Sequence, residues 1–197
     1  MASVVTRESY FDAGLEVLSD LGYGGLKLAE VCNRLGVTTG SFYHYFASWS
    51  AYTRALVKHW MQARTVSALD AIRTEPDPRR RIDALIQEGL ALPHGAEAAI
   101  RVWSAIDAEV RAVQAGVDSQ RFDFLVESAF EILHDKHQAE VFASWALYLL
   151  VGYEQAALPP RDDRDIEWIA AQLLDALDSG RFGTLAENQL IPPTPSV

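Results

Sequence analysis

The first predicted element is an amphipathic helix over residues 7–21. Its apolar side chains recur at the helical period, between acidic residues at every fourth position. The glycine-rich segment 22–25 ends it, because glycine readily adopts the left-handed geometry that stops helices. A second helix follows over about 27–35, and Gly36 ends it. A third short helix covers about 39–45.

The rest of the chain also has the patterning of helices. The further predicted helices cover residues 48–73, 78–92, 96–115, 118–134, 137–157 and 163–178. Prolines at positions 76 and 78 end the longest of them, and Pro159-Pro160 separates the last two. The proline-containing tail 180–197 is expected to be loosely ordered. Period-two alternation is absent, so the fold class is all-α.

Composition narrows the class of protein further. A chain of 197 residues has room for one sizeable domain, or for a small domain joined to a larger one. The single cysteine, Cys32, excludes an intramolecular disulfide framework and a Cys-rich zinc module, and it suits a reducing cytoplasm. The first residues carry charge too early for a secretory signal, and no apolar run approaches the roughly 20 residues of a membrane span. A cytoplasmic protein without membrane partners is expected.

Charge is divided unevenly along the chain. The net charge is −10, yet residues 1–64 hold six basic and five acidic groups, while residues 65–197 hold 11 basic and 22 acidic groups. A weakly positive end on an acidic body can approach a polyanion while the remainder stays repelled. Chance scatter of a few charges explains the same counts, so charge permits DNA binding without showing it.

Three short helices with a tight turn between the second and third predict a helix-turn-helix unit. Cys32 is small where the paired helices cross, Gly36 supplies the left-handed turn, and Phe42 anchors the third helix to the core. Thr38 or Thr39 can cap the third helix. The outward-pointing residues are then Thr39, Gly40, Ser41 and His44. Free N–H groups there suit phosphate contact or groove insertion.

The segment after Gly36 resembles the TetR family of transcriptional regulators. That family's N-terminal domain reads approximately G-V-S-x-G-x-x-Y-x-H/Y-F-x-S-K before a long fourth helix. The matching residues are Gly36, Val37, Gly40, Tyr43, Tyr45, Phe46 and Ser48, with Val31 and Cys32 as the preceding apolar-small pair. The resemblance spans about residues 7–60, and beyond it only helix count and chain length match.

The resemblance places the DNA contacts on six residues of the segment after Gly36. They are Thr38, Thr39, Gly40, Ser41, Tyr43 and His44. Tyr43 would give its hydroxyl to a phosphate, and Gly40 would let the backbone approach the groove. Ser41 and His44 would face base edges without fixing one base uniquely. The alternative is that the aromatic residues are core, which we favour for Phe42 and Phe46.

Two departures from the family pattern concern phosphate binding. Trp49 stands where the family usually has a lysine that clamps a phosphate, and Lys27 stands where it usually has a Thr or Ser cap. We hypothesise that Lys27 replaces the missing clamp, since phosphate contacts add salt-dependent, sequence-independent affinity. Trp49 would then pack beneath Tyr45.

In that family the larger domain binds a small ligand and dimerises through its last two helices. The resemblance therefore implies a DNA-binding domain over 1–47 and a regulatory domain over 48–197. The expected dimer residues are Leu147, Leu150, Ile166, Ile169, Leu173 and Leu177. The predicted helix over 137–157 is apolar nearly all round, so one side can meet the core and the other a partner. Burial wholly within one protomer is the alternative.

Large apolar side chains of the regulatory domain are candidates for lining an apolar cavity, where indole N–H and phenol O–H groups could hydrogen-bond a ligand. The candidate ligand residues are Trp60, Trp103, Ile106, Phe122, Phe130, Trp145 and Tyr148. Taken singly, each of these residues is more simply interpreted as plain core. The acidic surplus could favour a cationic ligand, although most such charges are simply solvated. The chemistry of the ligand is not readable at this level, and no cofactor is implied.

Enzyme motifs are nearly absent. Glu131 and His134 fit one Glu-x-x-His step, but a bundle di-iron site needs a second copy. His134, His137 and Glu140 lie at a predicted helix junction, where exposed capping is the simpler interpretation. The chain has no Gly-x-Ser-x-Gly, P-loop or His-Glu-x-x-His. It is not expected to be an enzyme or to hold a metal.

The sequence thus predicts a homodimeric transcriptional regulator, a repressor that a small-molecule effector releases from a pseudo-palindromic operator. The alternative is a dimeric ligand- or partner-binding module of the same fold without useful DNA affinity. Trp49 and the modest positive charge support that alternative.

Overall fold

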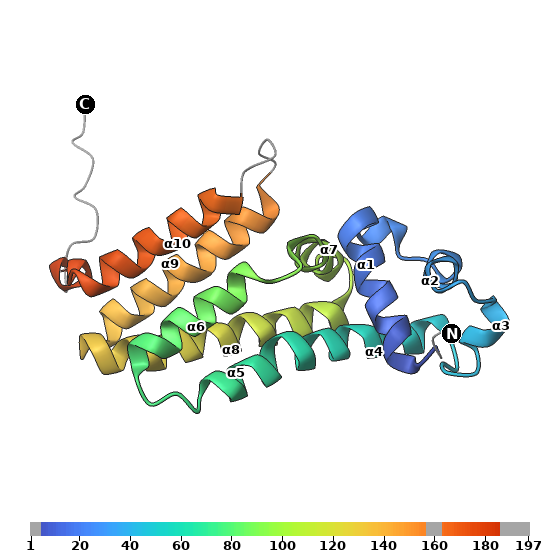
Figure 1. The fold of residues 1–197 in the computed structure, drawn as a ribbon, viewed down its shortest axis with the longest axis horizontal. Helices are drawn as coiled ribbons and strands as arrows, with labels where there is room; N and C mark the ends of the chain where they lie inside the picture. Colours follow the sequence, from blue (N-terminus) through green and yellow to red (C-terminus); the bar gives the residue numbers. More distant parts are fainter. Residues whose placement is uncertain (1–4, 157–162, 186–197) are drawn as a thin grey trace.

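The computed structural model describes residues 5–156 and 163–185, and within them the regular elements are all helical. Figure 1 shows an elongated molecule with the three N-terminal helices at one end and a bundle of the later helices forming the rest. The elements are α1 (Arg7–Gly25), α2 (Leu28–Leu35), α3 (Thr39–Phe42), α4 (Trp49–Met61), η1 (Gln62–Val66), α5 (Ser67–Ile72), α6 (Pro78–Leu90), α7 (His94–Ser104), α8 (Ala108–Leu133), α9 (Lys136–Gln155), α10 (Asp163–Asp178) and η2 (Arg181–Thr184). The all-α prediction is confirmed.

Two cores hold the molecule together. The first joins the buried faces of α1 to α4 with α7 and the first half of α8. The second lies between α6, the second half of α8, α9 and α10. The boundary predicted after residue 47 is therefore not a gap in packing, because the side chains of α1 to α3 share one core with α4 and α7.

Helix α1 begins and turns as its residues dictate. Thr6 accepts a hydrogen bond from the Ser9 amide, and the Ser9 hydroxyl accepts one from the Thr6 amide, so the two form a capping box. Gly22 leaves helical geometry with φ +66°, as the predicted end near residue 21 requires. The last turn, to Gly25, is set off by that kink.

The predicted long helix over 48–73 contains an irregularity. It runs as α4, then a π-helical segment η1, then α5, with helical backbone angles at both junctions. Ser48 caps its start by accepting a hydrogen bond from the Ala51 amide at 3.1 Å. Figure 1 shows α4 and α5 as one rod that leads from the small N-terminal helices along the body.

The predicted break between 96–115 and 118–134 is wrong. The interruption lies at residues 105–107, and α8 then continues unbroken past Gly116 to Leu133. Asp107 supplies the reason, because its carboxylate accepts hydrogen bonds from the Glu109 and Val110 amides and so starts the helix there. The third helix also ends earlier than predicted, at Phe42. A hydrogen-bonded turn follows it as far as Phe46.

Pro159-Pro160 and residues 186–197 of the predicted loose tail lie outside the described residues. Among the helices that the structure describes, none combines the length and apolar character that a membrane crossing demands.

Candidate nucleic-acid interface and cavity

The turn between α2 and α3 has helix-turn-helix geometry. Gly36 adopts φ +65°, which an L side chain disfavours, and the Val37 amide donates to the Cys32 carbonyl at 3.0 Å. Cys32 and Phe42 are both buried, as their predicted packing roles require. Thr38, rather than Thr39, caps α3, because its hydroxyl accepts a hydrogen bond from the Ser41 amide at 3.3 Å.

The tip of this unit is open to solvent. Thr38, Thr39, Gly40 and His44 are exposed, and Tyr43 is 55% exposed. Ser41 is only half-buried, and its hydroxyl lies 3.2 Å from the Thr38 hydroxyl. Five of the six residues carried over from the family pattern therefore share one accessible surface, while Ser41 is partly engaged in the cap.

The aromatic residues of the segment divide into two groups. Phe42 and Phe46 are buried, with ring centroids 5.1 Å apart. Tyr45 donates its hydroxyl hydrogen to the Val5 carbonyl at 2.6 Å, which ties the chain before α1 to this segment. Tyr43 meets the core at the Phe42 ring, at 5.3 Å between centroids. Its hydroxyl remains available for an outside acceptor.

Trp49, at the start of α4, is half-buried and packs against the first core. Its ring lies 4.9 Å from that of Tyr52 and 6.0 Å from that of Phe42, rather than beneath Tyr45 as expected. Lys27 occupies the N-cap position of α2, exposed, and its side chain does not bond the helix amides. Its ammonium is therefore free to point toward a partner.

Few cations near the tip remain unpaired. Arg34 donates to Asp20 at 2.6 Å and to Glu30 at 3.4 Å, and these bonds raise the pKa of its guanidinium. Arg7 lies over the Phe46 ring at 5.1 Å. Within the described residues, Lys27 and Lys58 are the exposed lysines of residues 21–64 without an ion pair.

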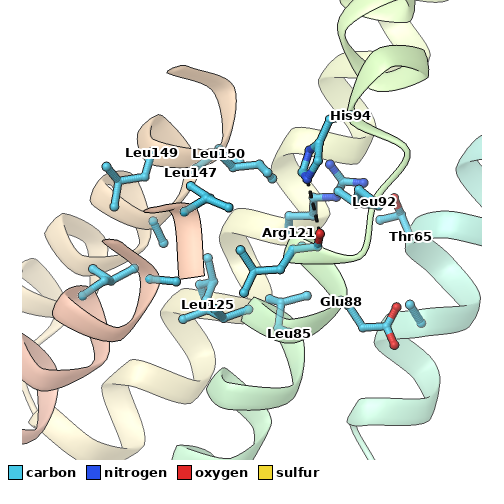
Figure 2. A pocket seen from close by; sticks show the side chains of 18 of the residues that line it. Thr65, Leu85, Glu88, Leu92, His94, Arg121, Leu125, Leu147, Leu149 and Leu150 are labelled. Carbon is cyan, nitrogen blue, oxygen red and sulfur yellow. Dashed lines mark hydrogen bonds between the residues drawn. The ribbon is translucent and has the colours of Figure 1, made fainter. Parts of the chain in front are cut away.

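A cavity of about 90 Å³ lies within the helical body, far from this tip along the chain. It is lined by residues of η1, α5, α6, α8, α9 and α10 and of the turn before α7. Its apolar lining includes Leu85, Leu125, Leu147, Leu150, Ile169 and Leu173, and its polar lining is Arg64, Thr65, Glu88, His94 and Arg121. Figure 2 shows His94, Arg121 and Thr65 on one side and Leu125, Leu147 and Leu149 on the other.

The structure does not bring the seven predicted ligand residues together at this cavity. Trp60 is buried and donates from Nε1 to Glu97 Oε1 at 2.6 Å, and Trp103 stacks on Tyr23. The others turn partly or largely to solvent, among them Ile106 at 72% and Tyr148 at 73% exposed. None of the seven appears among the side chains that line the cavity; they are Trp60, Trp103, Ile106, Phe122, Phe130, Trp145 and Tyr148.

Arg121 and Thr65 form the polar end of the cavity. Arg121 Nη1 donates to Glu97 Oε2 at 3.2 Å, and both side chains are more than nine-tenths buried. Arg121 Nη2 and the Thr65 hydroxyl are buried without a hydrogen-bond partner among the described residues. Sequence reasoning missed both residues.

His94 closes the same end from the start of α7. Its Nδ1 lies 3.4 Å from Glu154 Oε1 and its Nε2 lies 3.3 Å from the Leu90 carbonyl. The hydrogen bond to Glu154 raises the pKa of the imidazole above its ordinary value. His94 thus joins the turn after α6 to the end of α9.

The residues predicted for a dimer interface serve the single protomer first. Leu173 and Leu177 are buried in the second core. The other four, Leu147, Leu150, Ile166 and Ile169, line the cavity together with Leu173. The exposed large apolar side chains of α9 and α10 are instead Trp145, Tyr148 and Trp168, at 37%, 73% and 64%. The helical period alone could not say which side of each helix faces inward.

The candidate metal ligands do not assemble. His134 ends α8 in the left-handed conformation, with φ +55°, and both His134 and His137 are exposed. Within residues 5–156 and 163–185, no three His, Cys, Asp or Glu side chains are grouped so that they could hold a metal ion.

Comparison with known proteins agrees with the geometry of the tip. Residues 11–50 match the model of the bacterial regulatory proteins of the tetR family. The HTH-type transcriptional regulator BetI of Rhizobium meliloti (strain 1021) is 26% identical over 107 residues, which are 54% of this chain and 53% of that protein. The chain thus spans about half the length of the curated relatives it matches.

Solved structures share the fold over most of the chain. A TetR transcription regulator from Haloarcula marismortui ATCC 43049 superposes with a TM-score of 0.71 at 16% identity, covering 88% of this chain and 96% of that one. A transcriptional regulator from Saccharomonospora viridis, solved in complex with choline, gives 0.70 at 11% identity, with 87% and 95% coverage. At these identities the likeness concerns the fold alone.

Proposed function

We propose that this chain, which belongs to the tetR family of bacterial regulatory proteins, is a DNA-binding transcriptional regulator. It is further proposed to be a repressor that a small molecule releases from its operator in the cytoplasm. The observation that carries the proposal is the exposed tip after Gly36, where Thr38, Thr39 and Tyr43 are held outward by a buried aromatic core.

The proposed DNA contacts follow from that exposure. The tip enters the major groove, with His44 and Ser41 toward base edges and Gly40 allowing close backbone approach. Tyr43 gives its free hydroxyl to a phosphate. Lys27, exposed and unpaired, supplies the phosphate clamp that Trp49 cannot, because the Trp49 ring is packed against Tyr52. Because few other cations are free, the protein uses few phosphate contacts.

Two such tips are required to read a pseudo-palindrome. Recognition helices in a dimer lie about one DNA turn apart, roughly 34–36 Å. We place the dimer contact on the outer faces of α9 and α10, where Tyr148 and Trp168 are exposed. The leucines predicted for this role lie on the inner faces of the two helices, behind the proposed dimer contact.

The rod of α4, η1 and α5 connects the cavity to the tip. At one end, Thr65 of η1 and Leu69 of α5 line the cavity. At the other, Tyr52 of α4 donates its hydroxyl hydrogen to the Tyr10 carbonyl of α1 at 2.7 Å. A ligand that binds one position of the rod more tightly than another would therefore shift the tips. Functionally, residues 1–47 read DNA and residues 48–197 regulate.

A mobility-shift titration with the DNA upstream of the protein's own gene tests the proposal. Wild type should retard that DNA at submicromolar concentration in moderate salt, and Tyr43→Ala should weaken binding about tenfold or more. Tyr43→Phe is the matched control that removes only the hydroxyl, and it should show most of the loss. In the same titration, Lys27→Ala should reduce the salt slope by about one.

Absence of retardation at micromolar protein would favour the alternative, a ligand- or partner-binding module without useful DNA affinity. The paucity of free cations near the tip is the observation on its side. An unchanged salt slope for Lys27→Ala would refute only the proposed phosphate contact of Lys27.

A further inference from the structure

The polar end of the cavity has hydrogen-bonding capacity that the protein leaves unused. The Arg121 side chain is 7% exposed and Thr65 is 1% exposed, and both line the cavity. Arg121 Nη2 and the Thr65 hydroxyl have no partner among the described residues. A buried donor without an acceptor is costly, so these atoms favour an occupant that can accept hydrogen bonds.

The basic side chains at that end already have carboxylate partners. Arg121 is paired with Glu97 at 3.2 Å, and His94 with Glu154 at 3.4 Å. At the rim, Arg64 and Glu88 are exposed and opposite in sign. A buried anionic ligand would therefore remain uncompensated, because Glu97 already pairs with Arg121, and a cationic ligand would face the Arg121 guanidinium.

The remainder of the cavity is apolar and small. Leucines and isoleucines from α6, α8, α9 and α10 form its other walls, as Figure 2 shows for Leu125, Leu147 and Leu149. Its volume of about 90 Å³ lies below the range of roughly 300–1,000 Å³ that drug-sized ligands occupy. It suits a body of about one ring or a short branched chain.

We infer that the cavity binds a small uncharged molecule with an apolar body and one carbonyl-type oxygen, which accepts hydrogen bonds from Arg121 Nη2 and the Thr65 hydroxyl. This inference rests on the proposed function, because it names the chemical class of the regulator's effector. Thr65 belongs to η1 and Arg121 to α8, so one oxygen would bridge the rod to the body.

Calorimetric titration of the full chain with matched one-ring probes tests the class. Cyclohexanone should bind at least about tenfold more tightly than cyclohexanecarboxylate or protonated cyclohexylamine, because only the ketone adds no buried charge. Tighter binding of the carboxylate or of the amine would overturn the inference. Failure of all three probes to bind at millimolar concentration would overturn it as well.

Variants locate the bound oxygen. Thr65→Val keeps the side-chain shape and should weaken cyclohexanone about threefold to tenfold while leaving methylcyclohexane unchanged. Glu97→Gln leaves the Arg121 charge uncompensated, so its affinity for cyclohexanecarboxylate should rise about tenfold or more. The double variant Glu97→Gln/Arg121→Met keeps the charge balanced and the Thr65 hydroxyl in place, so it should weaken cyclohexanone about threefold to tenfold, as Thr65→Val does, and leave methylcyclohexane nearly unchanged.

Unchanged ketone affinity in both Thr65→Val and the double variant would contradict the assignment, and circular dichroism confirms that each variant is folded. The outcome is separable from that of DNA binding. If the protein retards DNA but binds no probe, the inferred ligand class is refuted and the proposed DNA-binding function is retained. If the protein binds cyclohexanone but no DNA, the proposed DNA-binding function is refuted and the ligand class is retained.

Discussion

Gly14 shows how tightly single residues are constrained where α1 crosses α4. An added Cβ at Gly14 would lie 2.1 Å from the Tyr52 hydroxyl and 3.0 Å from Leu56 Cδ2. Tyr52 is fully buried, and burial raises the pKa of its phenol. Its ring therefore has no room to withdraw without losing the bond to the Tyr10 carbonyl.

We expect Gly14→Ala to destabilise the protein by about 1–3 kcal/mol, through overpacking and the loss of one hydrogen bond. Gly116→Ala is the matched control, since it lies inside α8 with nothing within 4 Å of an added Cβ. It should leave stability unchanged or raise it by up to about 1 kcal/mol. Urea unfolding of both variants measures the difference, and equal midpoints would refute the close approach.

At the same scale, the sequence predicted the tip better than the cavity. The roles of Cys32, Gly36 and Phe42 follow from a local spacing, and the structure buries or turns each as expected. Arg121 gave a weaker signal, a charge on the same helical face as Val117 and Leu125. Its partner Glu97 lies on another helix, and no local pattern joins the two.

At the scale of elements, the His94–Glu154 contact fastens the start of α7 to the end of α9. Glu154 and, more weakly, Glu97 raise the pKa of His94. The folded state therefore binds this proton more tightly than the unfolded chain does. The resulting stability is fully present below the unfolded value of about 6.5 and is lost as pH rises through the higher folded pKa.

We expect His94→Gln to lower the free energy of unfolding most below about pH 6. The difference from wild type should shrink as pH rises through the pKa of His94 in the folded state. Thermal or urea unfolding from pH 5.5 to 9 measures it, and the other four histidines cancel in the comparison. A difference that stays constant across this range, or grows with pH, would exclude the linkage.

Helix boundaries were predictable where a cap or a proline marks them and not elsewhere. The ends near residues 21, 36 and 73 follow from glycines or prolines. The start of α8 depends on the Asp107 cap, which the predicted break after residue 115 left out of account. The inward side of α9 could not be predicted, because that helix is apolar on both faces and only packing against α8 and α10 chooses between them.

For the whole molecule, the change in charge along the chain falls within the rod that joins the tip to the cavity. The weakly positive residues 1–64 supply the exposed tip and the start of the rod, while the acidic remainder surrounds the cavity. Within the described residues the tip carries few free cations, so groove contacts and dimer spacing must supply much of its affinity. The account therefore stands on two tips acting together.

Hydroxyl-radical footprinting of wild type on the DNA upstream of its gene tests that claim most directly. Two protected patches are expected on one face of the duplex, with centres about 10–10.5 base pairs apart, and both should be lost in Tyr43→Ala. A single patch, or protection that Tyr43→Ala leaves intact, would contradict that claim.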